Sequence, residues 1–157
     1  YGKTKLDGEL AIQNINPPNS IIIRTSWVYS NFGNNFVKSM IELAESNNEI
    51  SVIDDQIGSP TNAADLAGTI LKIIPKIKGK DVEIFHYSNE GLCSWFHFAE
   101  EIFKIKKIKI KLKPIKSIEY LTKAKRPHFS VLNKSKIKSY FNIVIPSWEN
   151  SLRKFLN

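Results

Sequence analysis

Ser20-Ile21-Ile22-Ile23-Arg24-Thr25, which follows the breaker Asn16-Pro17-Pro18, is the clearest strand signal in the sequence. A short β-branched run between helix-breaking residues is typical of a strand that is buried on both faces. Upstream, residues 4–15 carry Leu6, Leu10 and Ala11 at helical spacing, and the two prolines end that helix. A helix that leads into a buried strand is typical of an α/β fold.

The alternation of helix and strand continues along the chain. The pattern predicts strands at residues 49–53 and 82–87, and a further strand within residues 104–116, where isoleucine or leucine alternates with lysine. It predicts helices at residues 36–44, 61–77, 94–102, 118–122, 134–140 and 148–155. In the helix after Thr61, we expect Leu66, Ile70, Ile73, Ile74 and Ile77 to face inward. The sequence therefore predicts an α/β architecture.

Composition and charge narrow the classes of function. No apolar run approaches the roughly 18 residues that a membrane span requires. A single cysteine, Cys93, excludes an internal disulfide, and we expect a cytoplasmic protein. The net charge of +8 is almost all lysine and is concentrated in residues 104–116, which we interpret as the solvent face of an edge strand rather than a nucleic-acid surface. The histidines and Cys93 lack the spacing of a metal site.

One pair of residues has the chemistry of carbonyl reduction. Tyr1 and Lys5 stand four residues apart on a predicted helix, so both side chains project from one face. Hydride transfer to a ketone leaves an alkoxide, which a positioned phenol can protonate. A nearby ammonium group lowers the pKa of that phenol from its ordinary value of about 10. By itself the pair is weak evidence, because an exposed helix face also carries such residues.

Several longer segments, in the same order along the chain, resemble the extended short-chain dehydrogenases, and most closely the dTDP-4-dehydrorhamnose reductases. They are residues 1–9 (Tyr-Gly-Lys-Thr-Lys-Leu-Asp-Gly-Glu), 24–30 (Arg-Thr-Ser-Trp-Val-Tyr-Ser), 33–37 (Gly-Asn-Asn-Phe-Val), 54–61 (Asp-Asp-Gln-Ile-Gly-Ser-Pro-Thr), 65–67 (Asp-Leu-Ala), 87–91 (Tyr-Ser-Asn-Glu-Gly), 94–95 (Ser-Trp), 124–132 (Ala-Lys-Arg-Pro-His-Phe-Ser-Val-Leu) and 146–148 (Pro-Ser-Trp). The resemblance covers the whole chain.

The resemblance implies an activity and a set of catalytic residues. It implies that NADPH or NADH reduces the C4 ketone of dTDP-4-dehydro-L-rhamnose to give dTDP-L-rhamnose, a polysaccharide precursor. Tyr1 is then the proton donor, and Lys5 lowers its pKa and binds the nicotinamide ribose. Thr25 and Ser26 are expected beside the nicotinamide. For the substrate, the resemblance implies that Trp27 packs on the deoxysugar and that Asn35 and Arg126 bind the nucleotide and its diphosphate.

The resemblance also implies a domain organisation. Residues 1–60 match the end of a Rossmann-type NAD(P)-binding domain, and residues 61–157 match mainly the small α/β substrate-binding part. The sequence has no glycine-rich turn that could hold a dinucleotide pyrophosphate, and the family's catalytic Ser or Thr precedes the tyrosine. We therefore expect a C-terminal portion that lacks reductase activity by itself, and that either self-associates through the surface left uncovered or rearranges locally in its N-terminal region.

Three other hypotheses remain open at this point. The chain also fits another extended short-chain dehydrogenase that acts on nucleotide sugars, either an epimerase or a fucose-synthase-like reductase. A non-catalytic relative that regulates a partner enzyme is a second alternative, which the retained Tyr1 and Lys5 disfavour. A nucleic-acid-binding module is a third, supported only by the lysine-rich segment.

Overall fold

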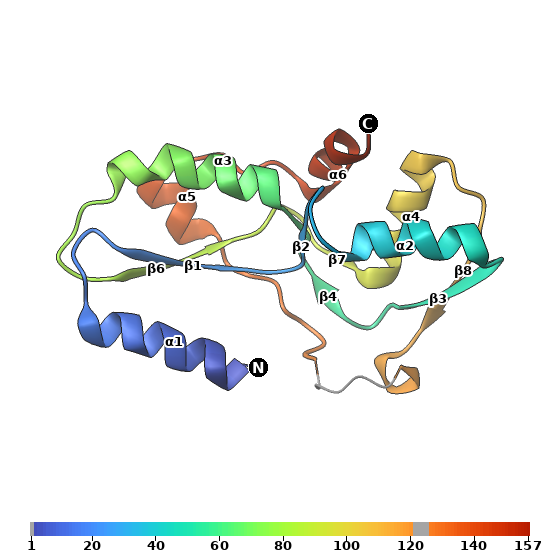
Figure 1. Cartoon of the computed structure of the whole chain (residues 1–157), viewed down its shortest axis with the longest axis horizontal. Helices are drawn as coiled ribbons and strands as arrows, with labels where there is room; N and C mark the ends of the chain where they lie inside the picture. Colours follow the sequence, from blue (N-terminus) through green and yellow to red (C-terminus); the bar gives the residue numbers. More distant parts are fainter. Residues whose placement is uncertain (1, 121–125) are drawn as a thin grey trace.

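The computed structural model describes residues 2–120 and 126–157 and is α/β, as expected (Figure 1). The helices are α1 (Gly2–Ile15), α2 (Phe36–Ser46), α3 (Ala63–Ile73), α4 (Trp95–Lys106), α5 (Ser135–Phe141) and α6 (Trp148–Leu156), with short 3-10 turns η1 (Ile74–Lys76) and η2 (Ser117–Glu119). The strands are β1 (Ile21–Thr25), β2 (Val28–Tyr29), β3 (Glu49–Ile53), β4 (Ile57–Gly58), β5 (Thr61–Asn62), β6 (Glu83–Tyr87), β7 (Cys93–Ser94) and β8 (Lys111–Ile115).

In the part of the chain that the structure describes, the strands pair in twos. β1 and β6 are parallel, with Ile21 opposite Glu83 and Thr25 opposite Tyr87. β3 and β8 form a second parallel pair. Two-residue pairs join β2 to β5 and, in antiparallel orientation, β4 to β7. Figure 1 shows α3 and α5 on one side of β1–β6 and α1 on the other.

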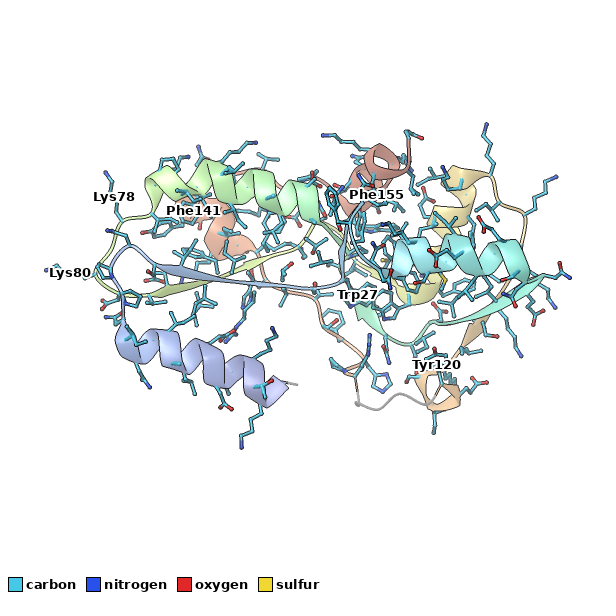
Figure 2. All side chains as sticks on the ribbon, viewed as in Figure 1. Trp27, Lys78, Lys80, Tyr120, Phe141 and Phe155 are labelled. Carbon is cyan, nitrogen blue, oxygen red and sulfur yellow. The ribbon has the colours of Figure 1, made fainter. Side chains whose placement is uncertain are left out.

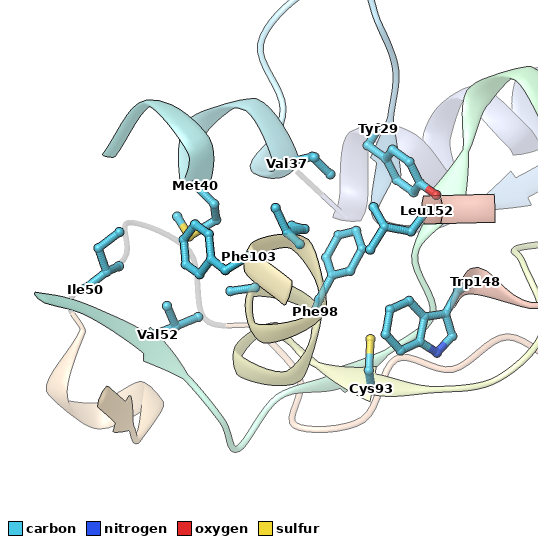
Figure 3. Close-up of a cluster of buried hydrophobic side chains, with 12 residues drawn as sticks. Tyr29, Val37, Met40, Ile50, Val52, Cys93, Phe98, Phe103, Trp148 and Leu152 are labelled. Atoms are coloured by element: carbon cyan, nitrogen blue, oxygen red, sulfur yellow. The ribbon is translucent and has the colours of Figure 1, made fainter. Parts of the chain in front are cut away.

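Two clusters of buried hydrophobic side chains hold these elements together. The first joins α2, β3, α4 and α6 and is centred on Phe98, which is fully buried (Figure 3). The second joins β1, α3, β6 and α5 around Phe85 and Tyr87. Each cluster combines segments from both sides of residue 60, so the predicted domain boundary at that position stays a prediction.

Two expectations about burial were wrong. β1 is only half-buried at Ile21–Ile23, and Arg24 and Thr25 are exposed, because β6 is its only partner among the described strands. Ile74 is 53% exposed rather than inward-facing. The reason is that α3 ends at Ile73 and the chain continues as a 3-10 turn that contains Pro75, which changes the direction of the side chains.

The lysine-rich segment, residues 104–116, forms the predicted strand over part of its length. Residues up to Lys106 belong to α4, and β8 begins at Lys111. In β8 the exposed lysines 111 and 113 alternate with Leu112, which packs on the first hydrophobic cluster. This is the pattern of a strand with one face in solvent.

A buried hydrogen-bond network connects the two clusters. Asn89, in the loop after β6, has no exposed surface. Its Nδ2 donates to Asp65 Oδ2 and to Ser151 Oγ, both at 2.9 Å, and its Oδ1 accepts the N–H of Asn62 at 2.7 Å. Ser151 Oγ also donates to Asp65. One amide side chain therefore ties α3 of the second cluster to α6 of the first.

Cys93 is structural rather than reactive. It lies in β7 with 5% of its surface exposed and packs in the first hydrophobic cluster. Burial raises the pKa of its thiol from 9.0 to about 12, so the group stays protonated near neutral pH. A protonated, buried thiol is a poor nucleophile.

α1 is the longest helix in the described residues, and Leu6, Leu10 and Ile15 are exposed on it. Neither α1 nor any other described helix combines the length and the apolar character that crossing a bilayer requires. An ion pair joins α1 to β1, because Arg24 Nε donates to Glu9 Oε1 at 2.8 Å. This contact is one of the links between α1 and the strand. The self-association expected from the sequence stays a prediction.

Candidate functional site

The carboxyl end of β1 carries the residues that were predicted to lie beside the nicotinamide. Thr25 is the last residue of β1, and Ser26 follows it. Ser26 Oγ donates to the carbonyl of Ser59 at 3.0 Å, and Thr61 Oγ1 donates to the carbonyl of Ser26 at 2.7 Å. These bonds hold the 59–61 loop against the end of the strand. The carboxyl ends of parallel strands are where α/β folds bind ligands.

Lys5 lies in the N-terminal half of α1 and is exposed, whereas its predicted partner Tyr1 lies outside the described residues. α1 and β1 run in opposite directions, so the N-terminal end of α1 and the carboxyl end of β1 both point towards the middle of the molecule (Figure 1). The Glu9–Arg24 pair is one contact between these two elements. The N-terminal end of α1, the helix that carries Lys5, therefore lies on the same side as the carboxyl end of β1.

Trp27 lies at the centre of the molecule (Figure 2) and is closely packed. Its indole stacks on that of Trp95, with ring centroids 3.6 Å apart and 12° between the planes. On Gly58, a Cβ would come within 2.5 Å of Trp27 Cε2 and Cζ2. Trp27 has a φ of 47°, a left-handed conformation that is uncommon for a bulky residue. The predicted contact of Trp27 with the deoxysugar stays a prediction.

Asn35 caps a helix, which is a structural role in addition to the ligand contact predicted for it. It is the N-cap of α2, where its Oδ1 accepts the N–H of Lys38 at 3.3 Å. Its Nδ2 donates to the carbonyl of Ser30 at 2.8 Å. An asparagine immediately before an amphipathic helix is itself an N-cap signal. Binding of the nucleotide by Asn35 stays a prediction.

A pocket of about 510 Å³ lies against α2, β3 and the start of α4. Its volume is within the range of small-molecule sites, and its lining is mostly apolar with a few polar groups. Among the described residues that line it, Arg126, which is exposed, is the one charged group. The lining residues are Phe36, Ser39, Met40, Leu43, Ile50, Ser51, Val52, Ile53, Gln56, Trp95, Tyr120 and Arg126.

The pocket adds residues that the sequence did not assign to a ligand. Trp95 and Tyr120 line it beside Arg126, and Trp95 also packs against the first hydrophobic cluster. Phe36 also lines it, with its ring centroid 4.6 Å from that of Trp95. The signal that could have found Trp95 is its position as the first residue of α4, directly after the capping Ser94. The free N–H groups at the N-terminus of a helix favour anionic ligands.

Asp54 and Asp55 take part in loop contacts near this pocket rather than forming a pair of catalytic acids. Asp54 accepts a hydrogen bond from Ser94 Oγ, the N-cap of α4. Asp55 accepts hydrogen bonds from the backbone N–H and from the Oγ hydroxyl group of Ser117, each at 2.9 Å. The two carboxylates therefore fix the positions of α4 and η2 around the pocket.

A family model and a curated relative both match this chain over nearly its whole length. The model of the RmlD substrate-binding domain matches residues 1–157. A dTDP-4-dehydrorhamnose reductase of Sinorhizobium fredii is 42% identical over 164 residues, which cover 99% of this chain and 55% of the relative. The chain thus spans about half the length of the curated relatives it matches.

Solved structures agree with the sequence comparison. The crystal structure of a dTDP-4-dehydrorhamnose reductase of Clostridium acetobutylicum superimposes with a TM-score of 0.92 at 40% identity and covers 99% of this chain and 54% of its own. A dTDP-4-dehydrorhamnose reductase of Bacillus anthracis, solved in complex with NADP, gives 0.90 at 40% identity, with coverage of 99% and 53%. The fold is that of the C-terminal portion of an extended short-chain dehydrogenase. The chain belongs to the RmlD substrate-binding domain family.

Proposed function

We propose that this chain provides the substrate-binding part, and the tyrosine–lysine pair, of an enzyme that reduces dTDP-4-dehydro-L-rhamnose to dTDP-L-rhamnose. The observation that carries the proposal is the pocket in which Arg126 stands beside an aromatic and apolar wall. A nucleoside diphosphate needs a cation for its phosphates and an apolar surface for its base, and this pocket offers both. Relatives named dTDP-4-dehydrorhamnose reductase support the choice of substrate.

The proposed chemistry divides between a bound cofactor and residues of the chain. NADPH or NADH supplies the hydride that reduces the C4 ketone. Tyr1 protonates the oxygen at C4, and Lys5 stabilises the phenolate form of Tyr1 and binds the nicotinamide ribose. The hydroxyl groups of Thr25 and Ser26, at the carboxyl end of β1, fit a polar group such as the carboxamide of nicotinamide. The sequence has no glycine-rich turn for the pyrophosphate, so another part of the protein holds it.

The proposal also covers the cellular compartment of the protein and the ligand that it binds. A single cysteine that is free and buried fits a reducing compartment, and we propose the cytoplasm. The relevant partner is the dTDP-sugar, because the family match concerns substrate binding. The match favours this function over a nucleic-acid-binding module.

Titration calorimetry of the 157-residue chain tests the proposed substrate. We expect saturable binding of dTDP-L-rhamnose, and binding at least tenfold weaker for GDP-mannose. Replacing Arg126 by Gln removes charge-assisted hydrogen bonds of about 1.5–3 kcal/mol, so the Kd is expected to rise by about tenfold or more. The matched control is Arg153→Gln, because Arg153 lies in α6 and pairs with Glu101. Equal affinity for the GDP-sugar, or equal effects of the two substitutions, would contradict the proposal.

A further inference from the structure

The loop between β3 and β4 meets two other segments beside the pocket of about 510 Å³. Gln56 of this loop lines the pocket, and so do Tyr120, which follows η2, and Arg126. Tyr120 and Arg126 belong to no helix or strand. Backbone outside regular elements is held less firmly than helices and strands are. The positions of these two side chains therefore depend on the contacts that their segments make with the loop.

The register of β3 and β8 brings Ser117 to Asp55. The two strands are parallel, with Ile53 opposite Ile115. Two residues further along, the backbone N–H of Ser117 donates to Oδ1 of Asp55, and its hydroxyl group donates to Oδ2, each at 2.9 Å. Both carboxylate oxygens therefore hold the start of η2, three residues before Tyr120.

Asp55 also contacts the segment that carries Arg126. The backbone carbonyl of Asp55 lies 3.0 Å from His128 Nδ1, and Nδ1 is the donor because a carbonyl can only accept. Oδ2 of Asp55 is 3.8 Å from the same nitrogen. Next to this contact, the N–H of Ile57 donates to the carbonyl of His128 at 2.8 Å, and the N–H of Ser130 donates to the carbonyl of Ile57 at 2.9 Å. The chain is thus tied to the loop two residues after Arg126.

The charge of Asp55 suits these contacts. Burial acts to raise the pKa of its carboxyl group, but the hydrogen bonds from Ser117 and the nearby imidazole of His128 outweigh burial and hold the pKa below its ordinary value. The group is therefore a carboxylate at neutral pH, and a carboxylate accepts stronger hydrogen bonds than a neutral oxygen does. The preceding Asp54 accepts a hydrogen bond from Ser94 instead, so the two neighbouring carboxylates hold different segments.

We propose that Asp55 is a positioning residue that sets the places of Tyr120 and Arg126 at the pocket. It does so by holding Ser117 and His128 against one loop. The inference rests on the proposed function, because it takes Arg126 as the cation that binds the diphosphate of the substrate. Asp55 is absent from the described residues that line the pocket, so its effect on a ligand passes through the two side chains that do line it.

Titration calorimetry of dTDP binding to the 157-residue chain tests this role. Asp55→Ala is expected to weaken dTDP binding about tenfold, close to the loss from Arg126→Gln, because the guanidinium group is no longer held for the diphosphate. Asp55→Asn keeps an oxygen for Ser117 and is expected to restore part of the affinity. The matched control is Asp81→Ala. Asp81 also accepts a side-chain hydrogen bond, from Asn16 at 2.9 Å, but is not part of the described lining of this pocket.

A double-mutant cycle separates positioning from a general loss of stability. Arg126→Gln is expected to raise the Kd for dTDP about tenfold in the parent chain, but less than about threefold in the Asp55→Ala chain, where the guanidinium group is already displaced. In the Asp81→Ala chain, Arg126→Gln is expected to keep its full effect. Urea unfolding of each variant shows that the comparison is made between folded proteins.

A pair of histidine variants repeats the test with the carboxylate in place, which also covers the case in which Asp55→Ala does not fold. His128→Ala is expected to weaken dTDP binding about threefold or more. His97→Ala is expected to leave it unchanged, because His97 stands beside Asp54 on α4. Equal affinities of the parent and Asp55→Ala, or an equal loss from Arg126→Gln in both chains, would overturn the inference and leave the proposed function intact. A parent chain that binds no dTDP would overturn both.

Discussion

Replacing Tyr1 by Phe is expected to lower the rate of ketone reduction by about 10²- to 10⁴-fold, the contribution typical of a positioned general acid. Phe keeps the ring and removes only the hydroxyl group that would protonate the C4 oxygen. Because this sequence has no glycine-rich turn for a pyrophosphate and spans about half the length of its relatives, the measurement uses a chimera. It joins the portion of the Sinorhizobium fredii relative that this chain does not match to the chain itself.

The loss is expected in kcat, with little change in KM, because the hydroxyl group acts in the transition state rather than in binding. Tyr140→Phe is the matched control, since Tyr140 is 55% exposed in α5, far along the chain from the predicted catalytic pair. The measurement is the steady-state oxidation of NADPH by the chimera with Tyr1→Phe and by the chimera with Tyr140→Phe. A chimera that keeps its full rate after Tyr1→Phe would remove Tyr1 from the mechanism.

The largest effect on stability is expected at Asn89. In Asn89→Ala, the side chains of Asp65 and Ser151 and the N–H of Asn62 all lose a partner in the interior. Asp65 and Ser151 keep the hydrogen bond to each other, whereas the N–H of Asn62 is left without a partner, which costs about 1–3 kcal/mol. With the two lost hydrogen bonds of the amide group added, we expect the free energy of unfolding to fall by about 2 kcal/mol or more. Because the network joins both hydrophobic clusters, the loss is expected to affect the whole fold.

Urea unfolding followed by far-ultraviolet circular dichroism measures this effect. The control is Asn150→Ala, because Asn150 is exposed in α6 and its replacement is expected to change the free energy of unfolding by less than about 0.5 kcal/mol. Similar losses from the two replacements would show that the network contributes little. A loss confined to one part of the transition would show that the clusters unfold separately.

Much of the fold could be predicted because the local signals agreed with one another. The helices at residues 36–44 and 94–102 were both predicted from sequence and are present as α2 and α4. Boundaries were least accurate where a residue's role depends on distant partners. Ile74 was placed inward because its spacing continues that of α3, yet Pro75 ends the α-helical geometry there.

The candidate site was less predictable for the same physical reason. Trp27 and Arg126 were found through resemblance, but the stack of Trp27 on Trp95 joins residues 68 positions apart and leaves no periodic signal. The close approach at Gly58 likewise depends on the ring of Trp27, which reaches it from the turn between β1 and β2. Asn35 shows the reverse case, since its capping role is local and could have been read from the sequence.

The most direct measurement of the central claim is turnover by the unmodified chimera with NADPH, using dTDP-4-dehydro-L-rhamnose and GDP-linked 4-keto sugars as alternative substrates. We expect the chimera to oxidise NADPH with the dTDP-linked ketone and to form dTDP-L-rhamnose. Its kcat/KM for the GDP-linked ketones is expected to be at least a hundredfold lower than its kcat/KM for the dTDP-linked ketone. A chimera that binds dTDP and NADPH but leaves the dTDP-linked ketone unreduced, or that prefers the GDP-linked ketones, would contradict it.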